Sequence, residues 1–332
     1  MKDYSLCIYS LTYNHGPFIK DTMDGFCIQE TDFPFVAVIV DDASTDNTQD
    51  VIQDYLNCHF LLEDSKMWET DDAQFIFAQH RENANCFFCT VFLKYNFFQQ
   101  FKSSFPVIED ILKDAKYIAL CEGDDYWIDS RKLYKQVHYL ERNTECGLVH
   151  TYAKVFVQSE NRYLDDLTGS DVVDENVQFV YNSIRTLTVC FRKDLYFRYM
   201  EEINPIAISK KWQMGDYPLF IFIMMNSNTH FIPDVTAVYR VADNSATHSR
   251  NMKKALDFCY SSLDCHTFMA RYYCKTELIN KIKVENLGYV LAIYNDRGLK
   301  PNLVGLLKRY KLSVLYHLRM LVKIYMKSFV PF

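Results

Sequence analysis

Short apolar segments rich in β-branched and aromatic residues alternate with segments of helical character through the first half of this chain. Four such segments are predicted to be strands, over residues 6–11, 35–40, 75–77 and 117–120. Pro17 suits the first turn of a helix after the first strand, and Asp46 and Thr48 suit a helix N-terminus after the second. This alternation predicts an α/β fold with a mostly parallel sheet and helices on both faces.

Further helices and strands are predicted in the rest of the chain. Helices are also predicted over residues 86–101, 217–225 and most of the chain from 252 onward, and strands over 186–192 and 234–240. We therefore expect one α/β domain over residues 1–250, with halves 1–128 and 129–250, followed by a helical C-terminal region over residues 251–332.

Charge is distributed unevenly along the 332 residues. The formal net charge of −6 combines −14 on residues 1–296 with +8 on residues 297–332, a segment without any carboxylate side chain. The acidic body argues against a nucleic-acid partner. The sequence has no run of 18 apolar residues and no signal-peptide pattern after Met1, so we expect neither a membrane span nor export.

The cysteine pattern does not point to a metal-binding or redox site. The eleven cysteines are an odd number, and most lie singly within apolar segments, so we expect reduced thiols in a cytoplasmic protein. Cys86 and Cys89 form a Cys-x-x-Cys pair, but neither a second ligand pair for zinc nor a clear redox context accompanies it. We expect these two residues to pack in the core.

Two of the predicted strands are followed by pairs of aspartates, Asp41-Asp42 and Asp124-Asp125. The carboxyl ends of parallel strands meet at one edge of the sheet, where ligands gather in folds of this kind. Carboxylates crowded at one edge are costly unless a cation or hydrogen-bond donors satisfy them. The pattern favours a divalent cation, Mn²⁺ or Mg²⁺, that bridges carboxylates to a diphosphate; the alternative is that these residues only cap helices and turns.

Three motifs in this order resemble the family 2 glycosyltransferases. They are Leu-Thr-Tyr-Asn-His at 11–15, Val-Asp-Asp-Ala-Ser-Thr-Asp at 40–46, and Glu-Gly-Asp-Asp-Tyr-Trp at 122–127. The resemblance covers roughly residues 5–245 and implies the GT-A fold, in which a nucleotide-binding sheet merges with an acceptor-binding half. It also implies a nucleotide-sugar donor, with a uridine diphosphate sugar as the expected form.

The resemblance assigns roles in the donor site. It implies that Asp42 accepts a hydrogen bond from the base, that Asp124 lies at the ribose, and that Asp125 binds the metal. Glu122 and Asp124 form a further acidic pair, so the set of direct metal ligands stays open. The loop residues implied for the base and ribose pocket are Thr12, Tyr13 and Asn14.

Three more residues receive roles from the resemblance. Asp216 resembles the general base that accepts the proton of the acceptor hydroxyl; the alternative is a helix N-cap. Arg81 is the candidate contact to the diphosphate, although this region lacks the glycine found in many relatives. His248 stands where some relatives place a histidine near the metal, with a solvated loop histidine as the alternative.

The resemblance implies an inverting, metal-dependent enzyme that transfers one sugar to a glycan or lipid-linked acceptor in cell-surface polysaccharide biosynthesis. The Gln-x-x-Arg-Trp motif of processive members is absent, so single transfer is expected. The basic segment 297–332 is predicted either to lie on the inner face of the cell membrane or to pack on the acidic body. The alternatives are an inactive sugar-nucleotide-binding or scaffold protein of the same fold and, more weakly, a nucleotidyltransferase.

Overall fold

The structure is a computed structural model that describes residues 4–171, 174–242 and 251–312. The chain divides into two compact units. The first comprises Met1–Val173, Ser183–Ser209 and Phe222–Ala242, and the second comprises Asp174–Asn182, Lys210–Ile221 and Asp243–Phe332. Each unit therefore combines segments that are distant in the sequence.

The first unit is built on one mixed sheet, which has eleven strands among the described residues. They are β1 (Leu6–Thr12), β2 (Phe35–Asp41), β3 (Lys66–Glu69), β4 (Ala73–Gln79), β5 (Cys86–Leu93), β6 (Tyr117–Leu120), β7 (Tyr126–Trp127), β8 (Cys146–Val157), β9 (Arg162–Tyr163), β10 (Cys190–Arg192) and β11 (Asn228–Val241). The order is β3-β4-β5-β2-β1-β6-β10-β8-β11-β7, with β9 paired to β8. Because β5, β2, β1 and β6 are parallel, their carboxyl ends lie along one edge.

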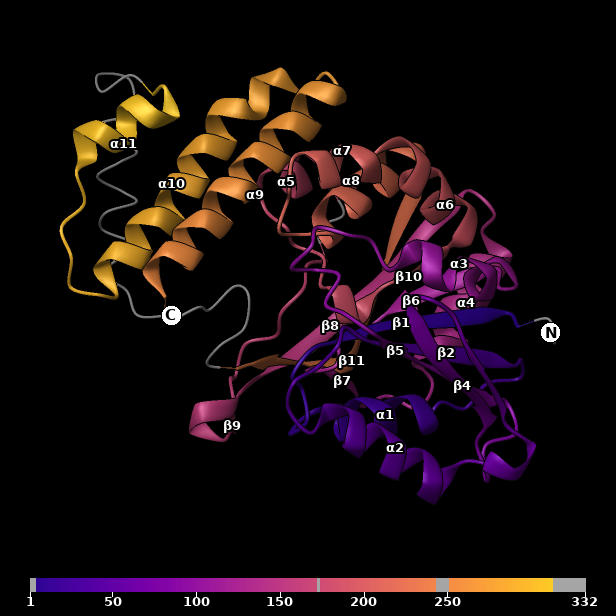
Figure 1. The fold of residues 1–332 in the computed structure, drawn as a ribbon. Helices are drawn as coiled ribbons and strands as arrows, with labels where there is room; N and C mark the ends of the chain where they lie inside the picture. The colour runs from indigo at the N-terminus through magenta and orange to yellow at the C-terminus, as the bar shows by residue number, and fades with distance from the viewer. Residues whose placement is uncertain (1–3, 172–173, 243–250, 313–332) are drawn as a thin grey trace. The chain divides into compact units, whose positions relative to one another are not determined.

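Helices cover both faces of this sheet (Figure 1). Those of the first unit are α1 (Ile19–Cys27), α2 (Thr48–His59), α3 (Phe105–Lys113), α4 (Lys132–Arg142), α6 (Lys193–Glu202) and α7 (Asn204–Ser209). Helices α1, α2 and α4 pack on the face that carries Leu6 and Ile8 of β1. On the other face Tyr9 Oη lies 2.7 Å from Ser104 Oγ, and Phe105 of α3 packs edge to face against Tyr196 of α6. The predicted α/β architecture is confirmed.

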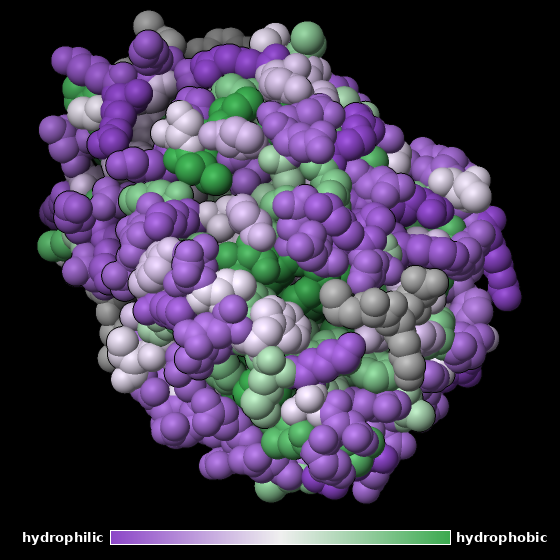
Figure 2. All heavy atoms as spheres, turned by 45° about the vertical axis from the view of Figure 1, so that its right-hand side comes forward, coloured by the Kyte–Doolittle hydropathy of each residue, from purple (hydrophilic) through white to green (hydrophobic). Residues whose placement is uncertain are grey.

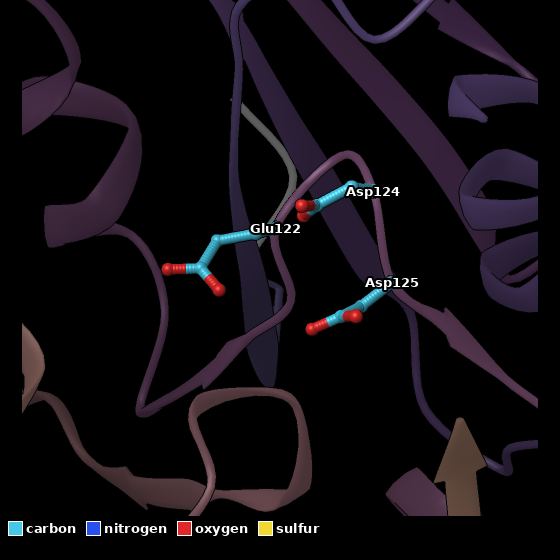
Figure 3. Close-up of side chains that lie close together, drawn as sticks. All are labelled: Glu122, Asp124 and Asp125. Atoms are coloured by element: carbon cyan, nitrogen blue, oxygen red, sulfur yellow. The ribbon is translucent and has the colours of Figure 1, made fainter. Parts of the chain in front are cut away.

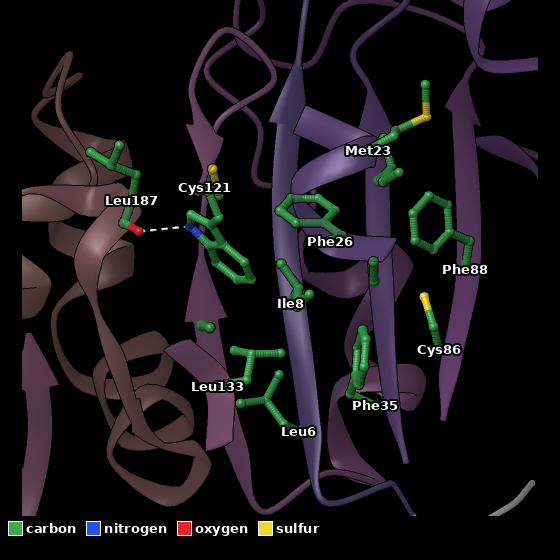
Figure 4. Packing of buried hydrophobic residues seen from close by; sticks show 14 of the residues in the cluster. Leu6, Ile8, Met23, Phe26, Phe35, Cys86, Phe88, Cys121, Leu133 and Leu187 are labelled. Carbon is green, nitrogen blue, oxygen red and sulfur yellow. Dashed lines mark hydrogen bonds between the residues drawn. The ribbon is translucent and has the colours of Figure 1, made fainter. Parts of the chain in front are cut away.

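The centre of the sheet is buried on both sides. All seven residues of β2 and all eight of β5 are buried. Phe26 of α1 lies over the sheet near Ile8 and Phe88 (Figure 4), with its ring centroid 4.9 Å from that of Trp127. The Trp127 indole donates a 2.8 Å hydrogen bond to the Leu187 carbonyl, so its one polar group is satisfied inside the core.

One predicted helix is wrong and two predicted strands need only small changes. The segment predicted as a helix over 86–101 begins with β5, which lies between β4 and β2 in the sheet. A strand covered on both faces is apolar at every position, so it loses the alternation that identifies strands in a sequence. Segment 75–77 lies within β4, and segment 186–192 divides into a 3₁₀ turn and β10.

All eleven cysteines are free thiols. Cys86 and Cys89 are both buried within β5, and burial raises the pKa of each thiol. Residues three apart on a strand point to opposite faces of the sheet, so this pair cannot close on one metal ion. The prediction that both residues pack in the core is confirmed.

The second unit is helical. It holds α5 (Glu175–Val180), the start of α8 (Asp216–Asn226), α9 (Met252–Tyr272), α10 (Ile279–Asn295) and α11 (Leu303–Tyr310). The Tyr217 ring stacks on His266 of α9 at 3.5 Å between centroids. Tyr310 of α11 donates a 2.7 Å hydrogen bond to Asn286 of α10 and packs with Leu287. The predicted helical C-terminal region is thus confirmed for its described part.

Hydrophilic residues cover most of the molecular face seen in Figure 2. Among the described helices, none combines the length and apolar character needed to cross a bilayer. Residues 313–332, which carry three of the basic residues of the predicted membrane-surface segment, lie outside the described part of the chain.

The buried His150 of β8 is expected to make the protein acid-labile. Burial lowers its pKa to about 4, helped by the nearby His230, whereas an unfolded histidine titrates near 6.5. Between these values the unfolded chain binds the extra proton, so stability falls as the pH falls from 6.5. The contribution is about 2–3 kcal/mol by pH 4.5.

Urea unfolding of the wild type and of His150→Leu at pH 6.5 and 4.5 measures this effect. The variant should lose about 2–3 kcal/mol less than the wild type over this interval. His266, whose pKa burial also lowers to about 4, is expected to leave part of the acid sensitivity in the variant. Equal losses in the two proteins would contradict the prediction.

Candidate active site

The loops that follow β1, β2 and β6 meet at the carboxyl edge of the sheet. The three strands are neighbours in the order β2-β1-β6 and run parallel. Backbone hydrogen bonds join the loops: Asp42 N donates to Thr12 O at 2.9 Å, and Gly123 N donates to Leu11 O at 2.8 Å. The predicted donor-site motifs are therefore brought together by strand pairing.

Three carboxylates lie on the loop after β6. Glu122, Asp124 and Asp125 offer oxygens that all lie within 4.8 Å of one another, and Figure 3 shows them on the same side of the loop. Asp125 is only 2% exposed, and burial raises the pKa of its carboxyl well above the usual range, with further increases from Asp124 and Glu122. Hard carboxylate oxygens in such a cluster fit Mg²⁺ or Mn²⁺, whose charge would offset this repulsion.

Arg240 of β11 fixes this acidic loop. Its backbone N–H donates to Asp125 Oδ1 at 2.7 Å, and its Nε donates to the Asp124 carbonyl at 2.8 Å. The same guanidinium forms a 2.6 Å ion pair with Asp21 of α1 and lies 4.8 Å from the Phe18 ring centroid. Arg240 is 6% exposed and its partner Asp21 is 51% exposed, so solvent screens this ion pair in part while the contacts to the acidic loop are buried.

Gly123 permits a close approach between two loops. A Cβ atom at this position would lie 2.6 Å from Thr12 Oγ1 and 3.0 Å from His15 Nδ1. On the opposite side, Thr22 of α1 donates to the carbonyl of Gly123 or of Asp125, at 3.1 and 2.6 Å. The glycine of the third motif is therefore required by packing.

The aspartate pair after β2 is held by different partners. Asp42 accepts hydrogen bonds from the backbone N–H groups of Phe97 (2.6 Å) and Phe98 (3.1 Å), while burial raises the pKa of its carboxyl. Asp41 Oδ2 accepts from Ser44 N at 3.1 Å, and its Oδ1 is buried without a hydrogen-bond partner among the described residues. Both carboxylates are therefore rigidly placed at the site.

The loop after β1 carries polar atoms that lack partners. Asn14, in a left-handed conformation with φ of 56°, accepts a 2.7 Å hydrogen bond from Thr45 N and so joins the first two motifs. Within the described residues, Thr12 Oγ1 and His15 Nδ1 are buried and make no hydrogen bond. Buried polar atoms of this kind normally bind a ligand or water, so a polar ligand fits here. Tyr13 lies on the same loop and is partly exposed.

His15 and Arg240 belong to this site although they are absent from the set predicted above. His15 Nε2 lies 3.9 Å from Asp124 Oδ2, and burial lowers its pKa despite that carboxylate. His15 is the last residue of the first motif, so the sequence contained a signal that could have identified it as a site residue. No local signal identifies Arg240, because its partners Asp125 and Asp21 lie more than 100 residues away in the sequence.

One predicted residue of the first unit, Arg81, does not lie at this edge. Arg81 follows β4, which runs antiparallel to β5, so it lies at the amino ends of β5 and β2, where its backbone N–H donates to His59 O. Asp216 begins α8 in the second unit and accepts a 2.8 Å hydrogen bond from Asn182. His248 lies outside the described residues.

Sequence comparison links this chain to known proteins. Residues 7–68 match the family described as Glycosyl transferase family 2. Uncharacterized proteins of Mycobacterium bovis and Mycobacterium tuberculosis are 27% identical over 249 residues, which cover 74% of this chain. The match covers 61% of those relatives, so this chain spans less than two thirds of their length.

The chain is also similar to solved structures. The mannosyltransferase PcManGT from Pyrobaculum calidifontis, in complex with GDP-Man and Mn²⁺, has a TM-score of 0.53 at 14% identity, covering 99% of this chain and 86% of that chain. S. aureus TarS 1-349 has a TM-score of 0.48 at 14% identity, covering 88% of this chain and 72% of that chain. The likeness to PcManGT confirms the predicted GT-A fold.

Replacement of Asp125 is expected to stabilise the protein when no metal is present. Asp125→Asn removes a buried carboxyl group that pays a desolvation cost when ionised and keeps an oxygen for the Arg240 N–H, so the free energy of unfolding should rise. Mn²⁺ at 100-fold above its Kd should stabilise the wild type by about 2.7 kcal/mol and the variant by far less.

Denaturant unfolding at pH 7.5, with a chelator or with Mn²⁺, tests both parts. Asp110→Asn is the matched control, because the Asp110 side chain is 93% exposed on α3. It should behave like the wild type under both conditions. A less stable Asp125→Asn protein, or one with a full Mn²⁺ effect, would overturn the assignment.

Proposed function

We propose that this chain, whose residues 7–68 match Glycosyl transferase family 2 and which has the GT-A fold, is a glycosyltransferase of that family that transfers one sugar, with inversion, from a nucleotide-sugar to a glycan or lipid-linked acceptor. The observation that carries the proposal is the cluster of Glu122, Asp124 and Asp125 at the carboxyl edge of the sheet. This edge is where ligands bind in open α/β sheets. The reaction belongs, in this proposal, to cell-surface polysaccharide biosynthesis.

The acidic loop is the proposed diphosphate end of the donor site. Asp125 would hold the divalent cation, Mn²⁺ or Mg²⁺, with Asp124 and Glu122 as neighbouring oxygen donors. When bound, such a cation neutralises the diphosphate as the bond to the sugar breaks. The PcManGT structure, which contains Mn²⁺ and a nucleotide-sugar, supports this use of the fold. Arg240 keeps the carboxylates in position.

The base and ribose are proposed to lie along the neighbouring loops. Asp42 and the loop residues Thr12, Tyr13 and Asn14 would bind the base, and Asp124 would also contact the ribose. The buried, unpartnered Thr12 Oγ1 and His15 Nδ1 support a polar ligand at this point. We propose a uridine nucleotide; since PcManGT is in complex with GDP-Man, a donor screen should also contain guanosine nucleotides.

Asp216 is the proposed general base. Its carboxylate would take the proton of the acceptor hydroxyl as that oxygen attacks the anomeric carbon, opposite the leaving diphosphate. Displacement from the opposite side inverts the configuration at this carbon. The Asn182 side chain donates to Asp216 Oδ2, which would orient the carboxylate.

The class of acceptor and the cellular location are inferred from the positive charge of the C-terminal segment. We propose that the basic segment 297–332 rests on an anionic membrane surface on the cytoplasmic side, where lipid-linked glycans are accessible. Its described part includes α11, on which Leu303 and Val304 are exposed beside Lys300 and Lys308. Apolar residues beside cations are typical of helices that bind membrane surfaces.

A donor screen tests the proposal most directly. Uridine and guanosine diphosphate sugars are incubated with the protein and Mn²⁺ or Mg²⁺, and release of the nucleoside diphosphate is measured. Metal-dependent release from one donor is the expected result. Nucleotide binding without release, even with acceptor extracts present, would favour the inactive sugar-nucleotide-binding alternative.

Asp216→Asn should separate binding from chemistry. The variant is expected to bind the donor as the wild type does, while kcat for transfer falls by about 10²–10⁴-fold, the usual contribution of a general base. Calorimetry and transfer assays give the two quantities. Asp257→Asn on α9 is the control, because Asp257 is a half-exposed partner of Lys253. Full activity in Asp216→Asn would contradict the assignment.

A further inference from the structure

Two side-chain amides hold the carboxylate of Asp216 in the second unit. Asn182 Nδ2 donates to Asp216 Oδ2 at 2.8 Å, and Gln178 Nε2 donates to Asn182 Oδ1 at 3.0 Å. Gln178 lies on α5 and is 1% exposed, while Asn182 is half-buried two residues beyond the end of that helix. The amide that contacts Asp216 is therefore itself held by a buried side chain.

The direction of these two hydrogen bonds is fixed by chemistry. An ionised carboxylate only accepts hydrogen bonds, so Asn182 has to present its NH₂ group to Asp216. Its oxygen then faces Gln178, which has to present an NH₂ group in turn. If the Asn182 amide turned over, its oxygen would face the carboxylate and two NH₂ groups would face each other. Each hydrogen bond thus keeps the other in its orientation.

The backbone around these side chains is anchored by other contacts. Tyr217 follows Asp216 in α8, is fully buried, and donates from its hydroxyl to the Phe179 carbonyl at 3.1 Å. His266 of α9 stacks on the Tyr217 ring, and its Nδ1 lies 3.1 Å from the same carbonyl. These contacts join α5 to the start of α8 without the two amides, so loss of an amide should act on the carboxylate more than on the fold.

We propose that Asn182 and Gln178 are positioning residues for the sugar transfer. Asn182 fixes the rotation of the Asp216 carboxylate, and Gln178 fixes Asn182. An N–H donor also favours the ionised form of a carboxyl group, and only that form can accept a proton from the acceptor hydroxyl. This inference rests on the proposed function, because it requires Asp216 to be the general base.

The other titratable side chains near Asp216, among the described residues, lie on α9 and just before α8. Burial above all raises the pKa of the Cys265 thiol, with further increases from Asp216 and Asp264 and a decrease from Lys210. Lys210 and Asp264 form an ion pair at 3.2 Å, and burial lowers the pKa of His266 to about 4. A substitution at position 182 leaves all of these groups in place, so a changed pH dependence would report the loss of the Asn182 contact.

The pH profile of kcat tests the role of Asn182. Asn182→Asp keeps the shape of the side chain but places a second carboxylate beside Asp216, and two carboxylates this close do not both ionise freely. The acid limb of the profile should therefore move up by about 1–3 pH units. Transfer from uridine and guanosine diphosphate sugars is measured between pH 5 and 9. Asn176→Asp, an exposed position on α5, is the matched control and should keep the wild-type profile.

Two further variants separate positioning from binding. Asn182→Ala should lower kcat by about 10–100-fold, the cost of a small misplacement of a reacting group, while KM for the donor stays unchanged. Gln178→Leu should lower kcat by a smaller factor in the wild type and by nothing further in the Asn182→Ala background, because the contact through which it acts is already lost. Circular dichroism checks the fold of each variant.

A nuclear magnetic resonance measurement needs no substrate. In protein labelled with carbon-13 at the aspartate carboxyls, the Asp216 signal is assigned by its absence in Asp216→Asn. This signal should titrate at higher pH in Asn182→Asp than in the wild type, and at the wild-type pH in Asn176→Asp. Equal titration in Asn182→Asp and the wild type, or wild-type kcat in Asn182→Ala, would refute the positioning role. Full transfer by Asp216→Asn would instead refute the proposed general base, so the two failures are distinguishable.

Discussion

The fold of the first unit has to hold Glu122, Asp124 and Asp125 close together against the electrostatic repulsion among their carboxylates. The three carboxylates stay within 4.8 Å of one another because the loop that carries them is bonded from several sides. Strand pairing holds its beginning, α1 holds its backbone through Thr22, and β11 holds its end through Arg240. These contacts come from segments far apart in the sequence, so the site exists only when the whole sheet has formed.

The same sheet places different chemistry at its two edges. At the carboxyl edge, backbone donors and carboxylates surround a space suited to a nucleotide and a cation. At the amino edge, an open groove is lined by Cys27, His80 and Arg131, among others. Helix α1 reaches both, since its Asp21 pairs with Arg240 and its last residue is Cys27. The two edges of one sheet therefore present different groups to the solvent.

Six of the eleven strands, β1, β2, β4, β6, β10 and β11, were predictable because strand periodicity is local, whereas β3, β5, β7, β8 and β9 were not predicted as strands. The strands that end in aspartates were recognised from apolar runs followed by polar residues, and both β2 and β6 were placed correctly. The helix predicted over 86–101 was wrong because a strand buried on both faces shows no alternation. The placement of Arg81 depended on the direction of β4, and strand direction leaves no mark in the local sequence.

The sequence by itself determined the alternating α/β pattern, the three motifs and their order along the chain. It thereby determined that Asp41, Asp42 and the acidic triplet each come directly after a strand, because adjacency to an apolar run is a local property of the chain. Only the tertiary structure decided which groups meet: Arg240 with the acidic loop, and Asn14 with Thr45. Pairing order, strand direction and helix packing set these contacts, and they are properties of the whole folded unit.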